Sequence, residues 1–218
     1  MYQPKYFRVG DSSPLHNLIQ NNALGILVTV LGSELEINHV PVVLDPDSGD
    51  LGRLRFHLAR SNPLADLLAA PPNSVNEVVF VFRAEQAYVS PDWYGQENMV
   101  PTWNYSVAHA HGHVDVLDDD GLIAVLDDLS AAQEGVLQKA PWTTQKMDQD
   151  LYIKMRRGII GFQMAIERLE GKLKMSQNRP REARESVIHA LDESGSDSQA
   201  RTAATMRELL LSDSQDSS

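Results

Sequence analysis

Alternating and apolar stretches divide the first part of the chain into short strands and helices. Residues 11–22 contain an N-cap Ser followed by Pro and then apolar side chains at helical intervals, which predicts a short helix. Residues 23–31 are apolar and β-branched, and they predict a strand buried on both faces. Residues 34–44 alternate and predict the next strand, with one face formed by Leu35, Ile37, His39, Pro41 and Val43.

The same pattern continues along the chain and indicates the fold class. Turn residues fill 45–52, and strands are expected at 54–58, 78–83, 86–90, 105–116, 158–168 and 172–176. Helices are expected after Asn62, after the aspartates 118–120, and after Asn178. About seven short strands at hairpin spacing predict a mainly β protein, a closed or split barrel with flanking helices. We assign residues 1–191 to this domain and residues 192–218 to a Ser- and Asp-rich tail, flexible or weakly helical.

The amino-acid composition limits the kinds of site the protein can contain and the cellular compartment it belongs to. The 218 residues include no Cys, which excludes disulfides, thiolate metal sites and a cysteine nucleophile. No apolar run approaches the roughly 18 residues of a membrane span, and the first residues lack a signal-peptide core. The sequence therefore predicts a soluble cytoplasmic protein.

The charge is acidic overall but unevenly distributed. Nineteen Lys and Arg face 30 Asp and Glu, a net charge of −11, whereas residues 151–190 hold nine basic and four acidic side chains. Any surface for nucleic acid should lie in that segment, because phosphate binding depends on clustered positive charge. The alternative is a solvated face of ion pairs. No clear helix-turn-helix accompanies the segment, so direct DNA binding has little support.

The segment from His57 to Pro63 is the first candidate site, because a predicted strand runs there directly into a helix. The unpaired N–H groups of a first helical turn attract anions, and Arg60, Ser61 and Asn62 add polar donors that suit a phosphate monoester. A capped helix with a surface arginine explains the same residues.

The second candidate is the aromatic stretch 88–105, which holds two of the three Trp and three of the six Tyr. Aromatic rings beside Asn and Thr donors suit a planar heteroaromatic ligand, through stacking and edge hydrogen bonds. A loop fixed to the barrel by its aromatic side chains is the structural alternative.

Histidines form the third candidate. In an extended strand His109, His111 and His113 share a face, but successive side chains there lie about 7 Å apart, too far to close easily on one zinc ion. We therefore predict no metal site, and expect one of these histidines to touch a ligand. His39 lies on an otherwise apolar strand face; it is a further candidate for contact with a ligand, and a hydrogen-bonded core histidine is the simpler interpretation.

The fourth candidate is the segment 171–179, which places Lys172 and Lys174 on one strand face, ahead of Ser176, Gln177 and Asn178. Contact with a phosphate or a flavin edge and a plain strand with a helix cap are both compatible with it. The sequence contains no G-x-S-x-G, G-x-G-x-x-G, phosphate-loop or H-E-x-x-H motif, so covalent hydrolysis and nucleoside-triphosphate chemistry are unsupported.

Taken together, these motifs resemble a known family. The shared motifs are M-Y-x-P at residue 1, H-x-A-R-x-N-P at 57, A-Y-V-S-P-x-W-Y at 87, V-P-T-W-N-Y at 100, P-W at 141, I-I-G-F at 159 and G-K-x-K-x-S-Q-N-R at 171. The chain resembles the PaiB-type, FMN-binding negative transcriptional regulators over roughly residues 1–191. The resemblance implies an FMN-binding split β-barrel of six strands, usually a homodimer with its flavin in clefts between the subunits.

The resemblance also implies which residues approach the cofactor. Arg60, Ser61 and Asn62 would lie near its phosphate, and Ser90, Trp93 and Tyr94 near the isoalloxazine. Residues expected to line the cleft, or to reach it from the C-terminal hairpin, are Thr102, Trp103, Asn104, Tyr105, His109, Lys174, Ser176, Gln177 and Asn178.

Three functions remain open at this point. The first is an FMN-responsive negative regulator of transcription. The second is an oxidoreductase that uses FMN with a nicotinamide donor, in which the cofactor carries the redox step. The third is a heme-binding split barrel with His109 or His111 as an axial ligand.

Overall fold

The computed structural model of the protein describes residues 1–31, 33–70 and 77–215. In chain order the elements are η1 (Lys5–Phe7), α1 (Ser13–Asn21), β1 (Leu24–Leu31), β2 (Glu34–Asp45), β3 (Arg53–Ala59), α2 (Pro63–Leu68), β4 (Val78–Val89), η2 (Pro91–Tyr94), β5 (Thr102–Gly112), β6 (Val114–Val116), α3 (Asp119–Glu134), η3 (Thr144–Lys146), α4 (Gln149–Arg156), β7 (Ile159–Ala165), β8 (Arg168–Lys174), α5 (Arg181–Glu193) and α6 (Asp197–Gln215). The mainly β architecture with flanking helices agrees with the prediction.

These elements form two compact units. Residues 1–18, 83–108 and 170–218 make the first unit, and residues 19–82 and 109–169 make the second. The long strands β4 and β5 contribute residues to both units. The hydrogen-bonded strand order is β6-β7-β3-β2-β1-β4-β5-β8.

The second unit is a curved antiparallel sheet with helices against it. β1 pairs with β2 along its whole length, β2 pairs with β3, and β3 pairs with β7. Alternate side chains point into one core, where the ring of Phe56 meets Phe80 at 5.1 Å and Phe162 at 5.5 Å between centroids. Helix α3 packs on β7, β2 and β3. This half-barrel sheet carries the segments 57–63 and 109–113.

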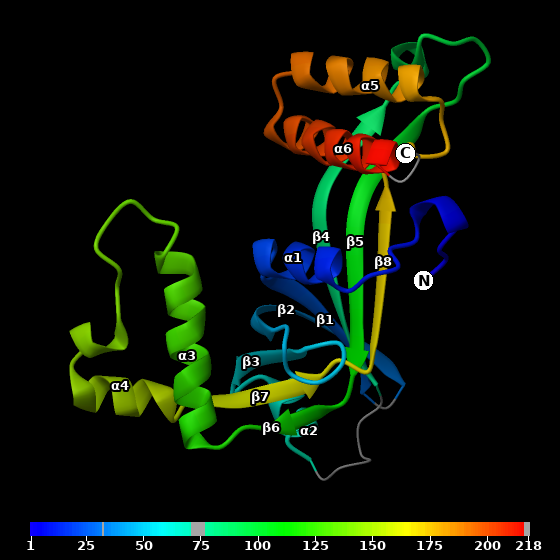
Figure 1. Ribbon diagram of the computed structural model, residues 1–218. Coiled ribbons are helices and arrows are strands. Elements are labelled where there is room, and N and C mark those ends of the chain that lie inside the picture. Colours follow the sequence, from blue (N-terminus) through cyan, green and yellow to red (C-terminus); the bar gives the residue numbers. More distant parts are fainter. Residues whose placement is uncertain (32, 71–76, 216–218) are drawn as a thin grey trace. The chain divides into compact units, whose positions relative to one another are not determined.

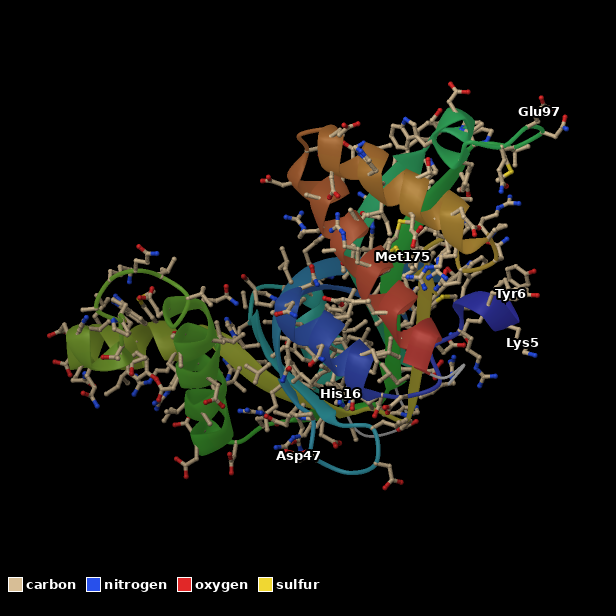
Figure 2. All side chains as sticks on the ribbon, turned by 45° about the horizontal axis from the view of Figure 1, so that its top comes forward. Lys5, Tyr6, His16, Asp47, Glu97 and Met175 are labelled. Atoms are coloured by element: carbon tan, nitrogen blue, oxygen red, sulfur yellow. The ribbon has the colours of Figure 1, made fainter. Side chains whose placement is uncertain are left out.

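The first unit pairs strands with the two C-terminal helices. Helices α5 and α6 lie side by side (Figure 1) and share a core with β4, η2 and the end of β8. Met175, labelled in Figure 2, is fully buried in that core, as are Val187, Leu191 and Met206. Burial of these side chains holds the helix pair on the strands.

Most predicted elements are present, but the strand predicted at 172–176 already begins at Arg168, and three further differences stand out. Residues 78–89 form one strand rather than two, the predicted strand 105–116 is divided between β5 and β6, and α4 was not foreseen. The short apolar stripe of α4 explains the omission, because its residues Leu151, Ile153 and Met155 are substantially exposed.

The prediction for β1 was wrong in one respect. We expected this strand to be buried on both faces, but only one of its faces is, through residues such as Leu27, which is fully buried. On the other face Leu24 is 62% exposed, and its neighbours Ile26, Val28 and Val30 are half-buried. Within the described residues of the second unit, this apolar run therefore forms a partly exposed outer face.

The C-terminal segment, predicted as a flexible or weakly helical tail, contains a helix in its described residues. Helix α6 runs for 19 residues, and Ala203, Met206 and Leu210 pack with Leu191 of α5 in one cluster. Because its apolar residues are sparse and interrupted by Ser and Thr, the helical pattern was weak in the sequence. No helix in the described ranges is both long and apolar enough to cross a membrane.

Candidate cofactor site

The C-terminal hairpin strand β8 places two lysines beside the aromatic strand β5. Lys174 Nζ donates hydrogen bonds to Thr102 Oγ1 and to the backbone carbonyl of Trp103. This contact joins the fourth sequence candidate to the second, both within the first unit. The Trp103 ring is 54% exposed and meets the ring of Tyr88 edge-on at 6.0 Å between centroids.

The cations of this cluster face aromatic rings instead of carboxylates. Lys172 Nζ lies 5.4 Å from the Tyr105 ring centroid, Lys174 Nζ lies 6.0 Å from that of Phe7, and Arg179 lies 5.6 Å from that of Tyr94. Among the described residues, none of the ion pairs joins Lys172, Lys174 or Arg179 to an acidic side chain.

Burial lowers the pKa of Lys174, and the positive charges of Lys172 and Arg179 lower it further. A bound anion stabilises a cation that is partly buried and lies near two like charges. We call these three residues, with the rings of Tyr88, Trp103 and Tyr105, the β8 cationic site.

Three other predicted site residues lie in the interior of the same unit. Ser176 Oγ donates to Asn104 Oδ1 at 3.0 Å and lies 3.3 Å from the Tyr94 hydroxyl. Asn104 Nδ2 in turn lies 3.3 Å from the sulfur of Met206. Tyr94, Asn104 and Ser176 are all buried, so their polar groups satisfy one another. In this arrangement they stabilise the end of the hairpin.

Gln177 also makes local hydrogen bonds. Its amide accepts from the backbone N–H of Met175 and donates to the carbonyl of Leu173, and it thereby closes the turn after β8. Asn178 is exposed beside this turn. Ser90 caps η2 without a side-chain hydrogen bond, and Trp93 is partly buried against the α5–α6 core.

The predicted phosphate-end residues belong to the second unit and serve the backbone there. Arg60 Nε donates to the carbonyl of Arg157 at 2.9 Å. Asn62 caps α2 by accepting from Leu64 N at 3.0 Å, and its amide donates to Asn38 Oδ1 at 2.8 Å. Ser61 is exposed next to them. The capped-helix interpretation accounts for Asn62, and the structure does not bring this group together with the lysines of β8 within either unit.

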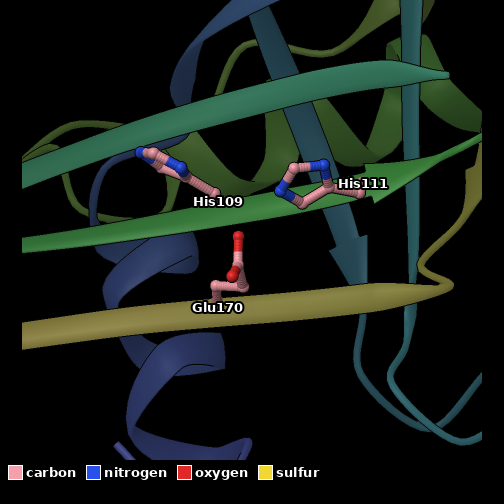
Figure 3. Close-up of side chains that lie close together, drawn as sticks. All are labelled: His109, His111 and Glu170. Carbon is pink, nitrogen blue, oxygen red and sulfur yellow. The ribbon is translucent and has the colours of Figure 1, made fainter. Parts of the chain in front are cut away.

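The histidines of β5 lie on one strand, with the rings of His109 and His111 at 6.3 Å between centroids (Figure 3). His111 is buried, and its Nδ1 lies 2.7 Å from Arg168 Nη2 and 3.5 Å from Glu77 Oε2. These contacts engage the ring that could otherwise bind a ligand. Glu170, the third residue drawn there, belongs to β8, and its carboxylate binds the N-terminal ammonium at 3.0 Å.

Two placements differ from the sequence interpretation. His39, expected to be a core histidine, is exposed on the outer face of β2. Phe7 and Tyr2, which flank the lysines of β8, were not foreseen as site residues. Their position depends on the N-terminal segment lying along β8, where Arg8 pairs with Lys172, and local sequence carries no signal for that pairing.

Comparison with known proteins connects this geometry to a family. Residues 1–168 match a family model described as "Putative FMN-binding domain". The chain is 30% identical over 210 residues to the protease synthase and sporulation protein PAI 2 of Bacillus subtilis, covering 96% of this chain and 98% of that protein. It is 32% identical over 243 residues to an uncharacterized protein of Emericella nidulans, covering 95% and 97% of the two chains.

The chain belongs to the PaiB-type FMN-binding family. FMN is accordingly its cofactor. The β8 cationic site fits such a ligand, since FMN combines a phosphate with a planar ring system, and the site combines unpaired cations with exposed aromatic rings.

Solved structures share the fold of this PaiB-type chain. An FAD- and heme-binding protein of Mycobacterium smegmatis has a TM-score of 0.57 at 16% identity, over 84% of this chain and 79% of that one. The flavocytochrome Anf3 of Azotobacter vinelandii has a TM-score of 0.53 at 10% identity, over 79% and 72%. At these identities the likeness extends to the fold alone, which supports the predicted split-barrel class.

Proposed function

We propose that this protein is an FMN-responsive negative regulator that works as a homodimer and holds its flavin at the β8 cationic site, in a cleft completed by the partner subunit. The observation that carries the proposal is the cluster of Lys172, Lys174 and Arg179, which has no acidic partner among the described residues and borders exposed aromatic rings. When bound, FMN supplies reversible hydride and electron transfer.

Different residues of the site would bind different parts of FMN. The cations would hold the phosphate through charge-assisted hydrogen bonds. Tyr88, Trp103 and Tyr105 would offer ring faces and edges to the isoalloxazine. The buried contacts of Ser176 with Tyr94 and Asn104 would fix the turn that follows Lys174, so that the cations are held in place before the ligand arrives.

The uncovered face of the second unit supports the dimer. Register places Val28 opposite Ile37 and Val30 opposite Leu35, so this part of the face of β1 and β2 is apolar, and His39, opposite Ile26, adds one polar position to it. Leu35 and Ile37 are 68% and 57% exposed. A contiguous exposed apolar face marks an interaction site, and a second copy with the same face is its natural occupant.

Regulation through a partner or a product is better supported than direct binding to DNA. Of the nine basic residues of the segment 151–190, three form ion pairs: Arg156 with Asp119, Arg168 with Glu77 and Arg181 with Glu185. Three more, Lys172, Lys174 and Arg179, belong to the β8 cationic site, and Arg184 is buried, so that Lys154 and Arg157 are the exposed cations outside these groups. A gel shift at low salt should therefore show no duplex binding, and a clear shift would contradict this form of the proposal.

The flavin site is tested by titrating FMN into the protein and following the visible absorbance and fluorescence of the flavin. We expect about one FMN per subunit, and an affinity at least ten-fold lower for Lys174→Met. Lys154→Met is the matched control, because Lys154 is an exposed lysine on α4 in the other unit. Equal affinity in the two variants would place the flavin elsewhere.

A flavin-dependent oxidoreductase is the second candidate. The ion pairs just described favour it, because they occupy part of the basic segment that direct binding to DNA would need. The FMN-loaded protein should then be bleached by NADH or NADPH under anaerobic conditions. Flavin that stays oxidised with both donors, and that passes no electrons to acceptors after reduction by dithionite, would exclude this candidate.

A further inference from the structure

We propose a second small-molecule site, inside the second unit, that takes a neutral aromatic compound carrying a hydroxyl or carbonyl group. The site is a cavity of about 270 Å³ between α3, η3, α4 and the strands β3 and β7. Its apolar wall consists of Leu126, Trp142, Met147, Met155 and Ile159. Neither the flavin cluster nor the uncovered sheet face uses any of these residues, so the inference is independent of the proposed function.

Two polar atoms at this cavity lack a partner. His57 and Tyr152 line it, and both His57 Nδ1 and the Tyr152 hydroxyl are buried with no hydrogen-bond partner among the residues that the structure describes. Buried polar atoms are almost always paired, because leaving one unpaired costs stability. A polar group on a ligand that sits between these two rings, after a small turn of either side chain, supplies the missing partner.

The charges around the cavity define the ligand class. No acidic side chain lines it within the described chain, and its one cation, Arg156, is already bound to Asp119 at 2.8 Å. Burial lowers the pKa of His57, so its ring is neutral near pH 7. Trp142 and the two methionines suit a flat apolar body. The cavity therefore fits a neutral aromatic molecule of one or two rings with a single polar group.

The proposal also accounts for two motifs that the flavin site leaves unused. His57 opens the segment H-x-A-R-x-N-P and Trp142 ends the pair Pro141-Trp142, and the fold brings both to this cavity although 84 residues separate them. Trp142 is held there by its backbone N–H, which donates to Glu134 Oε2 at 2.7 Å.

Equilibrium dialysis with 2-naphthol and with naphthalene tests the site, because the two probes differ only by a hydroxyl. We expect saturable retention of 2-naphthol at one per subunit, with at least ten-fold preference over naphthalene. Tyr152→Phe removes only the unpaired oxygen, and it should reduce the preference several-fold while naphthalene still binds. Leu126→Trp fills the cavity and should abolish retention of both probes.

Ser130→Ala is the matched control, since the Ser130 hydroxyl lines the cavity but already donates to the Leu126 carbonyl at 2.8 Å. It should leave the preference unchanged. His57→Phe provides a second test of the polar partners if Tyr152→Phe melts early. Equal retention of the two probes by the wild type, or retention that survives in a folded Leu126→Trp variant, would overturn the proposal. Displacement of 2-naphthol by FMN, one for one, would overturn it too, because the cavity would then belong to the flavin site.

Discussion

At the scale of single residues, the C-terminal hairpin depends on one unusual position. Ser176 has a positive φ of 61°, a left-handed backbone conformation that residues other than glycine seldom adopt. Its hydroxyl lies between Tyr94 and Asn104 in the interior, and these contacts hold the residue there. The turn that leads from the lysines of β8 into α5 is therefore determined by buried hydrogen bonds.

Ser176→Ala should cost about 1–3 kcal/mol of unfolding free energy, because it leaves the Asn104 carbonyl oxygen buried without its donor. Urea unfolding followed by circular dichroism measures the loss. Ser212→Ala, at an exposed position near the end of α6, should stay within about 0.5 kcal/mol of the wild type. Similar values for the two variants would show that the buried network contributes little.

His57 gives the stability a pH dependence whose sign follows from burial. The folded pKa of His57 lies below that of an unfolded histidine, so the unfolded chain takes up the proton first as the pH falls. The contribution of His57 is fully present above the ordinary histidine pKa of about 6.5 and is lost as the pH falls through the folded pKa.

Urea unfolding between pH 7.5 and pH 5 should therefore show a smaller fall in stability for His57→Phe than for the wild type. His113→Phe is the control, because His113 is exposed and bound to Glu167. A slope unchanged by His57→Phe would mean that His57 is not desolvated in the folded protein.

At the scale of elements, α6 is an integral part of the first unit. The helix has few apolar residues, yet Ala203 and Met206 are fully buried and Leu210 nearly so. They pack against Leu191 of α5, and Ser198 Oγ donates to the Gln86 carbonyl of β4 at 2.7 Å. Packing against α5 and β4 therefore stabilises helix α6, whose own helix propensity is weak.

Met206→Ala should destabilise the protein by about 2–5 kcal/mol, because it opens a cavity among fully buried side chains. Thermal and urea unfolding both report the change. Leu211→Ala, one turn further along at a side chain that is 64% exposed, should cost under about 0.5 kcal/mol. A loss in Met206→Ala no larger than that of Leu211→Ala would show that α6 packs loosely.

At the scale of the whole molecule, the exposed apolar residues of β1 and β2 indicate an interaction surface. A soluble monomer seldom exposes a large apolar patch, and Leu24, Val28, Leu35 and Ile37 lie on one face of the paired strands β1 and β2. Two copies that share this face would remove it from water.

Ile37→Glu should convert the dimer into a monomer without unfolding it, because the charge lies at the surface of each subunit and at the centre of the proposed interface. Light scattering coupled to size-exclusion chromatography measures the mass. Val136→Glu, at another apolar side chain that is 77% exposed, should remain dimeric. A monomeric wild type at tens of micromolar, or a dimeric Ile37→Glu variant, would contradict the dimer.

The sequence by itself determined the features that depend on local chemistry. Alternation placed β2 and β3, and an Asn-Pro pair placed the cap of α2. For the two lysines of β8, the sequence left a phosphate or flavin-edge contact and a plain strand with a helix cap both open. Motif resemblance identified the family because those residues are close together along the chain.

Only the tertiary structure decided which segments meet. The pairing of the N-terminal segment with β8 and the packing of α6 on α5 join residues far apart in the chain. It also decided that one face of β1 is left uncovered and that His57 and Trp142 share a cavity. Which side chains are buried, and which groups they contact, depends on contacts between distant segments, and no local pattern of the sequence encodes these contacts.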